Sequence, residues 1–303
     1  MSFSLRPFTP PDFTQEKFRN APNATLVPCP KDGVAPEAYH AMSIFPEYFK
    51  VDGQWIMAKE SRMDCVPVYE NGVIFVREFR LLKAGDLVFT GRTENCENGI
   101  YVYPDGFRES TVQQDVFAFR QNRSRETAFS KDYDEIYDLL RHDREHGKIV
   151  WVMGPAFAFD YDARNAFAKL VNGGYVHAVL AGNALATHDL EGAYLNTALG
   201  QNIYTTQNQP NGHYNHLDLL NRVRYHGSVS KFIEEEQIDN GIIYNLEKNH
   251  IPYVLGGSIR DDGPLPPVFA NVYEAQDAMR NQVRTPPRSS VWPLCCIPSR
   301  RAI

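Results

Sequence analysis

One segment near the end of the sequence combines glycines with charged side chains directly after an apolar run. Residues 251–255 read IPYVL, and residues 256–264 read GGSIRDDGP. Glycines allow backbone amides to approach a phosphate or a ribose closely. Arg260 can clamp a carboxylate, while the adjacent Asp261 and Asp262 offer one group for a cationic amine and another for proton transfer. The alternative is a capped turn that carries a solvated Arg-Asp pair.

A second segment of similar design carries a histidine. The apolar run 176–182 ends at Gly182, Asn183 follows it, and His188 and Asp189 come one turn further along. A carboxylate beside an imidazole can fix its tautomer and keep it ready for proton transfer. The alternative is that Asn183 only caps a helix and that His188 is structural.

Two further segments are less specific. The apolar run 149–154 ends in Gly154 and Pro155, which is an ordinary way to end a strand. Residues 211–216 read NGHYNH and are interpreted as a polar lid over a small-molecule site. Neither GxGxxG nor GxxxxGK[ST] occurs in the sequence, so the two best-known phosphate-binding fingerprints are missing.

The elements that position these residues alternate between strand and helix. Expected strands cover residues 149–153, 176–181 and 252–255, and expected helices cover 162–171, a stretch from 184, 214–226, 228–249 and 272–284. This alternation predicts a parallel sheet with right-handed crossovers. The glycine-rich segments then follow the carboxyl ends of neighbouring strands, which is where α/β proteins bind ligands.

The first part of the chain has a different pattern. Residues 41–125 contain short aromatic or β-branched runs separated by Asp-Gly, Asn-Gly and Ala-Gly pairs, which favour tight hairpin turns. They predict a small antiparallel β domain, with a boundary near residue 125. Residues 1–40, rich in Pro and Asn, are expected to form an extended arm over the surface.

Composition narrows the class of protein. The formal net charge of -6 argues against a nucleic-acid partner, and no apolar run is long enough to span a bilayer. Five cysteines without paired metal spacing favour reduced thiols, a cytoplasmic location and no metal site.

Three strings carry a family resemblance: LAGNALATHDLEGA, NGHYNHLDLLNRVR and GSIRDDGPLPPVFANVYEAQDAMR. They resemble the archaeal-type, NAD-dependent ornithine cyclodeaminase family, also known through its LOR/SDH region. They are also similar to the C-terminal part of cyanobacterial arginine dihydrolase/ornithine cyclodeaminases. The likeness begins near Tyr39, includes VDGQWIMAKESRMDC and LKAGDLVFTGR, and ends at Arg284.

The resemblance implies a β-rich first subdomain followed, at residues 126–284, by a Rossmann-like subdomain similar to the NAD-binding fold of deoxyhypusine synthase. It implies conversion of L-ornithine to L-proline and ammonia, with hydride passing to and from bound NAD. The resemblance also implies the amino-acid substrate and further copies of the chain as partners. The residues expected to bind the cofactor are Gly154, Pro155, Gly182, Asn183, Ala184, Gly257, Ser258 and Ile259. The expected catalytic residues are Arg260, Asp261, Asp262, His188 and Asp189.

The sequence departs from the family pattern after Arg284. Residues 285–303 read TPPRSSVWPLCCIPSRRAI, where the family continues with a strand and a motif like LATxLHxIAxGN. A back-translation of this tail, read in a shifted frame, gives LATVLHTIAAGN. We therefore expect that a frameshift follows Arg284, that the α/β domain is truncated, and that the tail supplies no family strand.

Two alternatives to the cyclodeaminase remain open. An NAD-dependent dehydrogenase or cyclase for another amino acid or imine would keep the same cofactor segments. A non-catalytic NAD-binding fragment is the alternative from a different functional class.

Overall fold

The chain folds as two units of different class. The computed structural model describes residues 7–106, 130–258, 264–284 and 289–294. One unit contains residues 4–125, and the other contains residues 126–303 together with 1–3. The first is built from antiparallel strands, whereas the second alternates strands with helices. The predicted fold class is confirmed.

The first unit contains two antiparallel sheets, of strand order β1-β6-β4-β5 and β3-β2-β7. Their elements, with the short helices of this unit, are α1 (Glu16–Arg19), β1 (Thr25–Pro28), β2 (Glu47–Val51), β3 (Gln54–Met57), β4 (Val66–Glu70), β5 (Val73–Arg77), η1 (Phe79–Leu81), β6 (Leu87–Thr90) and β7 (Ile100–Val102).

The hairpin turns of this unit follow the sequence signals. Asp52 and Gly53 join β2 to β3 with φ values of 49° and 79°. Asn71 and Gly72 join β4 to β5 with φ values of 50° and 83°. Two consecutive left-handed residues match the twist of the flanking strands, which is why Asp-Gly and Asn-Gly pairs favour such turns.

Residues 7–40, expected to belong to an extended arm, contain regular structure and make long-range contacts. Within the described part, β1 pairs with β6, and Phe18 of α1 is buried. The ammonium of Lys50, on β2, donates hydrogen bonds to the carbonyls of Phe18, Arg19 and Ala21 at 3.0, 2.8 and 2.8 Å. A buried lysine therefore ties this segment to the sheet, a long-range contact that composition does not reveal.

The second unit is built on a four-stranded parallel sheet of order β12-β9-β8-β13. The strands are β8 (Lys148–Met153), β9 (Ala178–Gly182), β12 (Tyr253–Gly256) and β13 (Ser289–Leu294). If the four strands are numbered by their order along the chain, their order across the sheet is 3-2-1-4, as in part of a Rossmann sheet. The strand order therefore reverses beside β8. In the tail, which was expected to supply no family strand, Ser289–Leu294 form β13 and pair with β8 along its length.

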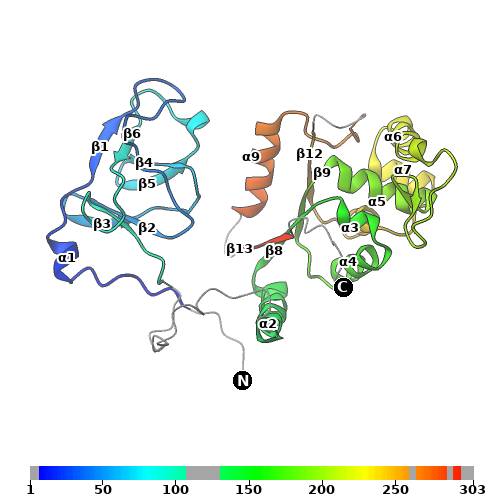
Figure 1. Ribbon diagram of the computed structural model, residues 1–303, viewed down its shortest axis with the longest axis horizontal. Coiled ribbons are helices and arrows are strands. Elements are labelled where there is room, and N and C mark those ends of the chain that lie inside the picture. The colour runs from blue at the N-terminus through cyan, green and yellow to red at the C-terminus, as the bar shows by residue number, and fades with distance from the viewer. Residues whose placement is uncertain (1–6, 107–129, 259–263, 285–288, 295–303) are drawn as a thin grey trace. The chain divides into compact units, whose positions relative to one another are not determined.

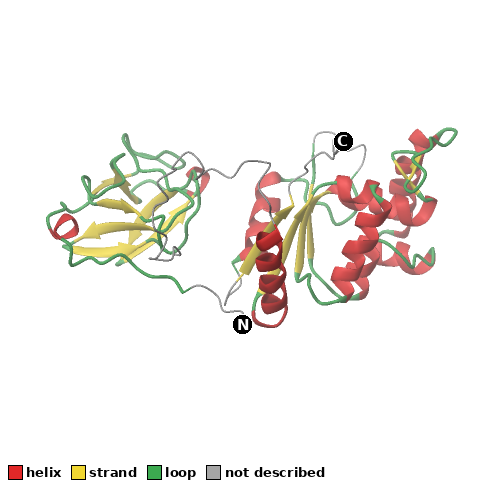
Figure 2. Ribbon diagram, turned by 60° about the horizontal axis from the view of Figure 1, so that its bottom comes forward, coloured by secondary structure: helices red, strands yellow, loops and turns green. Residues whose placement is uncertain are grey.

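Helices cover both faces of this sheet (Figures 1 and 2). On one face, α9 (Val272–Val283) packs on Val150, Leu180 and Val254. The opposite face carries the larger core, formed with residues of α4 (Tyr161–Asn172), α5 (Asn183–Leu195), α6 (Asn215–His226), α7 (Val229–Glu235) and α8 (Ile242–Lys248). The unit also contains α2 (Ser130–His146), α3 (Ala156–Phe159), β10 (Thr197–Ala198), β11 (Gln201–Asn202) and η3 (Gly212–Tyr214).

The single helix expected over residues 228–249 is two helices, α7 and α8. Gln237 has a φ of 54° and Gly241 a φ of 108°, values at which a helix cannot continue. A Cβ on Gly241 would lie 2.4 Å from a guanidinium nitrogen of Arg164 and 2.9 Å from a carboxylate oxygen of Asp189. The break brings the start of α8 against a buried ion pair.

Candidate functional site

Three strand ends meet at one edge of the parallel sheet. Gly182 ends β9 and pairs with Gly256, which ends β12. Met153, the last residue of β8, pairs with Ala181, so Gly154 follows it at the same edge. These three glycines leave the backbone accessible at the carboxyl edge, beside the point where the strand order reverses. That is the position at which such sheets bind nucleotides.

The first turn of α5 begins directly at this edge. Its N-cap is Gly182, and no side chain caps it. Asn183 is therefore not the cap that the sequence allowed. It is buried, and its Oδ1 accepts a hydrogen bond from the amide of Leu265 at 3.0 Å. Asn183 thus ties α5 to the chain that follows residues 259–263, while the amides at the helix start have no side-chain cap.

The other residues expected to hold a cofactor differ in their surroundings. Pro155 is the N-cap residue of α3, and Ala184 lies in the first turn of α5. The amide of Gly257 donates to the carbonyl of Phe269 at 2.9 Å, and Ser258 is exposed beside it. Ile259, Arg260, Asp261 and Asp262 lie outside the described residues.

His188 and Glu191 form a buried pair on α5. The Nδ1 of His188 lies 3.0 Å from the Oε2 of Glu191, one turn along the helix. The aromatic ring of Phe159, at the end of α3, lies 5.0 Å from the imidazole centroid to centroid. His188 is 8% exposed and Glu191 fully buried. Among the described residues, the Nε2 of His188 has no hydrogen-bond partner.

The carboxylate of Glu191 is well satisfied despite its burial. Burial alone raises the pKa of Glu191, but hydrogen bonds from His188, from the amides of Gly200 and Leu199, and from the Thr197 hydroxyl outweigh it. The net result is a pKa below the ordinary value for glutamate. Glu191 is therefore an anion at neutral pH, and Nδ1 of His188 must carry the proton that it shares with it.

Asp189 faces a different set of groups. Its Oδ1 accepts from the Nε of Arg164 at 2.6 Å and from the amide of Ile242 at 2.9 Å, and its Oδ2 accepts from the amide of Ile243 at 2.7 Å. Asp189 is fully buried, and Arg164 is 2% exposed. These contacts cap α8 and neutralise a buried guanidinium, which favours a structural role. Of the two neighbours expected to act together, His188 pairs with Glu191 instead.

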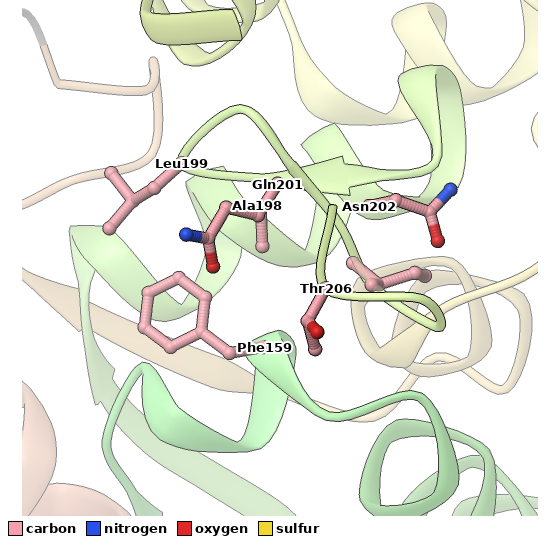
Figure 3. A pocket seen from close by; sticks show the side chains of 7 residues that line it. Phe159, Ala198, Leu199, Gln201, Asn202 and Thr206 are labelled. Carbon is pink, nitrogen blue, oxygen red and sulfur yellow. The ribbon is translucent and has the colours of Figure 1, made fainter. Parts of the chain in front are cut away.

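A small hollow lies above Phe159 (Figure 3). Its volume is about 360 Å³, and it is lined by Phe159, Ala198, Leu199, Gln201, Asn202, Ile203 and Thr206. The side-chain amide of Gln201 lies over the Phe159 ring, whereas that of Asn202 points away from it (Figure 3). Within the segment 200–213, expected as a loop, Gln201 and Asn202 form β11, which pairs with β10 in a short hairpin. The β10 strand of this hairpin contacts α5.

Residues 211–216, interpreted from the sequence as a polar lid, form the short helix η3 and the start of α6. The ring of His216 lies 6.1 Å from that of His188. Sequence reasoning did not foresee Arg164, Phe159 or Thr197 as neighbours of the site. The spacing His188–Glu191, one helical turn, was the available signal for their pairing. Within the described part of the chain, no group of three His, Cys, Asp or Glu side chains could hold a metal ion.

The family model described as "Arginine dihydrolase ArgZ-like, C-terminal, Rossmann fold" matches residues 134–288, just over half of the 303-residue chain. The chain belongs to that family. The ornithine cyclodeaminase of Methanocaldococcus jannaschii is 36% identical over 268 residues, which cover 86% of this chain and 62% of that protein. The chain thus spans less than two thirds of the archaeal relatives that it matches.

Solved structures extend the family likeness to three dimensions. A LOR/SDH protein from Methanococcus maripaludis S2 has a TM-score of 0.75 and 36% identity, over 86% of this chain and 78% of that one. The ternary complex of AgrE with ornithine and NAD+ has a TM-score of 0.50 and 31% identity, over 88% of this chain and 36% of that one. The predicted relationship to ornithine cyclodeaminases is confirmed. None of the described helices is long and apolar enough to cross a membrane.

Proposed function

We propose that the protein is an NAD-dependent ornithine cyclodeaminase-like enzyme, which converts L-ornithine to L-proline and ammonia. The observation that carries this proposal is the glycine-bordered carboxyl edge of a 3-2-1-4 parallel sheet in a chain of this family. AgrE, a member of the same structural family, has been crystallised with ornithine and NAD+.

The residues at the sheet edge fit a dinucleotide. Gly154 and Pro155 would lie beside its phosphates at the reversal point, and the uncapped first turn of α5, with Gly182, Asn183 and Ala184, offers amides to an anion. Ser258 and Ile259 would continue the cradle beyond β12. Since the Gly257 amide is bound to Phe269, Gly257 would contribute close approach, not a hydrogen bond. Bound NAD would supply a hydride acceptor for the α-carbon of ornithine and return the hydride to the cyclic imine.

The chain's own residues must hold the substrate and move protons. His188 is our choice for proton transfer, because one of its nitrogens is fixed and the other has no partner among the described residues. Arg260 would hold the α-carboxylate, and Asp261 and Asp262 would face the amines. The proton released at one amine is consumed when ammonia departs, so a single shuttling group is sufficient. Asp189 is assigned to structure because both of its oxygens are already bonded.

The test is an assay of the full chain with L-ornithine and NAD. Proline and ammonia should form in equal amounts, without net accumulation of NADH, because the hydride is returned within each cycle. Calorimetric titration with NAD reports cofactor binding independently. Accumulation of NADH with ornithine, or turnover of another amino acid alone, would favour the dehydrogenase alternative. Absence of NAD binding would contradict the proposal.

A further inference from the structure

Glu191 accepts more hydrogen bonds than Asp189, the other carboxylate of α5. Its Oε2 faces the Nδ1 of His188 and the amide of Leu199, both at 3.0 Å. Its Oε1 accepts from the hydroxyl of Thr197 at 2.8 Å and from the amide of Gly200 at 3.0 Å. Each oxygen thus accepts two hydrogen bonds, and the side chain is fully buried. Such a carboxylate has one available orientation.

This orientation decides which nitrogen of His188 carries the proton. An ionised carboxylate can only accept hydrogen bonds, so the nitrogen that faces it must donate. With Nδ1 protonated, the neutral imidazole presents a lone pair at Nε2. A histidine free to choose its tautomer would hold its proton on Nε2 for part of the time and would then be unable to accept one there.

The other groups packed against His188 do not compete with Glu191. Phe159, from α3, contributes an uncharged ring. His216, from α6, is the second titratable group, with its ring centroid 6.1 Å away. Asp189, on the same helix, is bound to Arg164 and to the start of α8. Among the described residues, Glu191 is the one anion that contacts the imidazole.

The same carboxylate also fixes the hairpin that lines the hollow above Phe159. It binds Thr197, Leu199 and Gly200 of that hairpin. The φ values of Leu199 and Gly200 are 52° and 74°. The Thr197 hydroxyl in turn accepts from the Nδ2 of Asn215 at 2.9 Å. The histidine and the hairpin are therefore held by one side chain.

We propose that Glu191 is the positioning residue of this site: it holds His188 as the Nδ1–H tautomer, with Nε2 ready to accept a proton from the substrate. The role in turnover rests on the proposed function, whereas the tautomer does not. The two parts of the proposal can therefore fail separately.

The tautomer is measured by nitrogen NMR of protein labelled with 15N-histidine. The His188 signals are assigned by their loss in His188→Gln. In the wild-type protein at neutral pH, Nδ1 should show the shift of a protonated nitrogen and Nε2 that of an unprotonated one. The opposite assignment, or an even mixture of the two tautomers, would overturn the proposal without any variant at Glu191.

Glu191→Gln sharpens the test because it keeps size and removes charge. The amide oxygen can still accept from Thr197 and Gly200, while its NH₂ group faces Nδ1, loses the hydrogen bond from the Leu199 amide and draws the proton of His188 to Nε2. We expect an inverted tautomer and a loss in kcat/KM of about 100-fold or more, the scale of general acid–base catalysis. The pH midpoint of kcat/KM should also move, because the charge beside the imidazole is gone.

Two further variants distinguish a loss of His188 positioning from a nonspecific loss of activity. Thr197→Val removes a hairpin contact of Glu191 and should leave the tautomer unchanged. Glu247→Gln changes another carboxylate of this unit, bonded to Ser230 and Tyr253, and should leave both tautomer and kcat/KM unchanged. If Glu191→Gln and Glu247→Gln lower kcat/KM equally, or if Glu191→Gln keeps full activity, Glu191 has no positioning role. If the wild-type protein makes no proline but shows the expected tautomer, the proposed function fails and the arrangement of the pair stands.

Discussion

Each unit of the molecule contains a buried histidine–glutamate pair, and the two pairs are not alike. In the first unit, Nε2 of His40 lies 2.7 Å from Oε2 of Glu47, and Nδ1 lies 3.3 Å from the carbonyl of Gly91. Both ring nitrogens face acceptors. In the second unit, only Nδ1 of His188 faces an acceptor, and Nε2 has no partner in the described part of the chain.

This difference in hydrogen bonding indicates a structural role for His40 and leaves His188 available for proton transfer. Both ring nitrogens of His40 are already engaged, so using either one for a substrate proton would break an existing contact. It borders a hollow of about 290 Å³ but presents no available nitrogen to it. The Nε2 of His188 has no hydrogen-bond partner among the described residues. The complete pair is expected to stabilise the fold, whereas the incomplete pair is the one to which we assign proton transfer.

The largest effect on stability is expected from a third buried pair, which contains no histidine. Asp189→Asn leaves the guanidinium of Arg164 buried without a counterion and points an amide donor at a backbone donor of α8. Because arginine cannot release its proton, the free energy of unfolding should fall by about 3–5 kcal/mol. Denaturant unfolding measures this loss. An unchanged midpoint, with activity abolished, would return Asp189 to the catalytic residues.

The next largest loss of stability is expected from Gly200→Ala in the second unit, with Gly72→Ala in a hairpin of the first unit as its control. Gly200→Ala would place a Cβ 2.2 Å from a backbone carbon of Gly212, whereas at Gly72 nothing lies within 4 Å. Both glycines have positive φ, so each alanine costs about 1 kcal/mol for conformation. The clash should add about 1–3 kcal/mol at Gly200 alone. Equal midpoints for Gly200→Ala and Gly72→Ala would show that the close approach of Gly200 to Gly212 does not stabilise the second unit.

Glu47→Gln should cost less, about 1–2 kcal/mol. The Nε2 of His40 can accept from the new amide, and its Nδ1 can still donate to the carbonyl of Gly91. The variant should keep its activity per folded molecule. Thermal or denaturant unfolding gives the cost, and a loss above that of Asp189→Asn would contradict this account of His40.

The smallest effect is the pH dependence that Glu191 contributes. Its folded-state pKa lies below its ordinary value of 4.5, so its contribution to stability is complete above that pH and is lost as the pH falls through the folded-state value. Unfolding curves recorded below neutral pH should therefore converge for wild-type protein and Glu191→Gln as acid is added. Curves that stay parallel over the whole range would show that Glu191 is not stabilised as an anion.

Local signals predicted the elements of both units well, and distant contacts explain what they missed. The Asp-Gly and Asn-Gly hairpins and the glycine ends of β8, β9 and β12 follow from short-range geometry. The order of residues 7–40 depends on Lys50, and the break between α7 and α8 depends on Arg164 and Asp189. These partners are far apart in sequence, so no local pattern marks them.

Local sequence patterns also fail to predict which residues lie next to one another in the candidate site. Residue type and neighbours predict His188 as a site residue, and adjacency in sequence predicts Asp189 as its partner. On a helix, residues three apart share a face and adjacent residues do not, so Glu191 is the partner in space. Phe159 and the hairpin that completes the surroundings come from other elements, and only the fold brings them together.

The central claim is that the second unit contains the reactive histidine and that the first contains a structural one. The most direct test is the rate of proline formation from ornithine and NAD by His188→Gln and His40→Gln proteins, compared at a temperature where both are folded. The account predicts a loss of about 100-fold or more for His188→Gln and a rate within a few-fold of wild type for His40→Gln. Equal losses in the two variants, or full activity without His188, would contradict it.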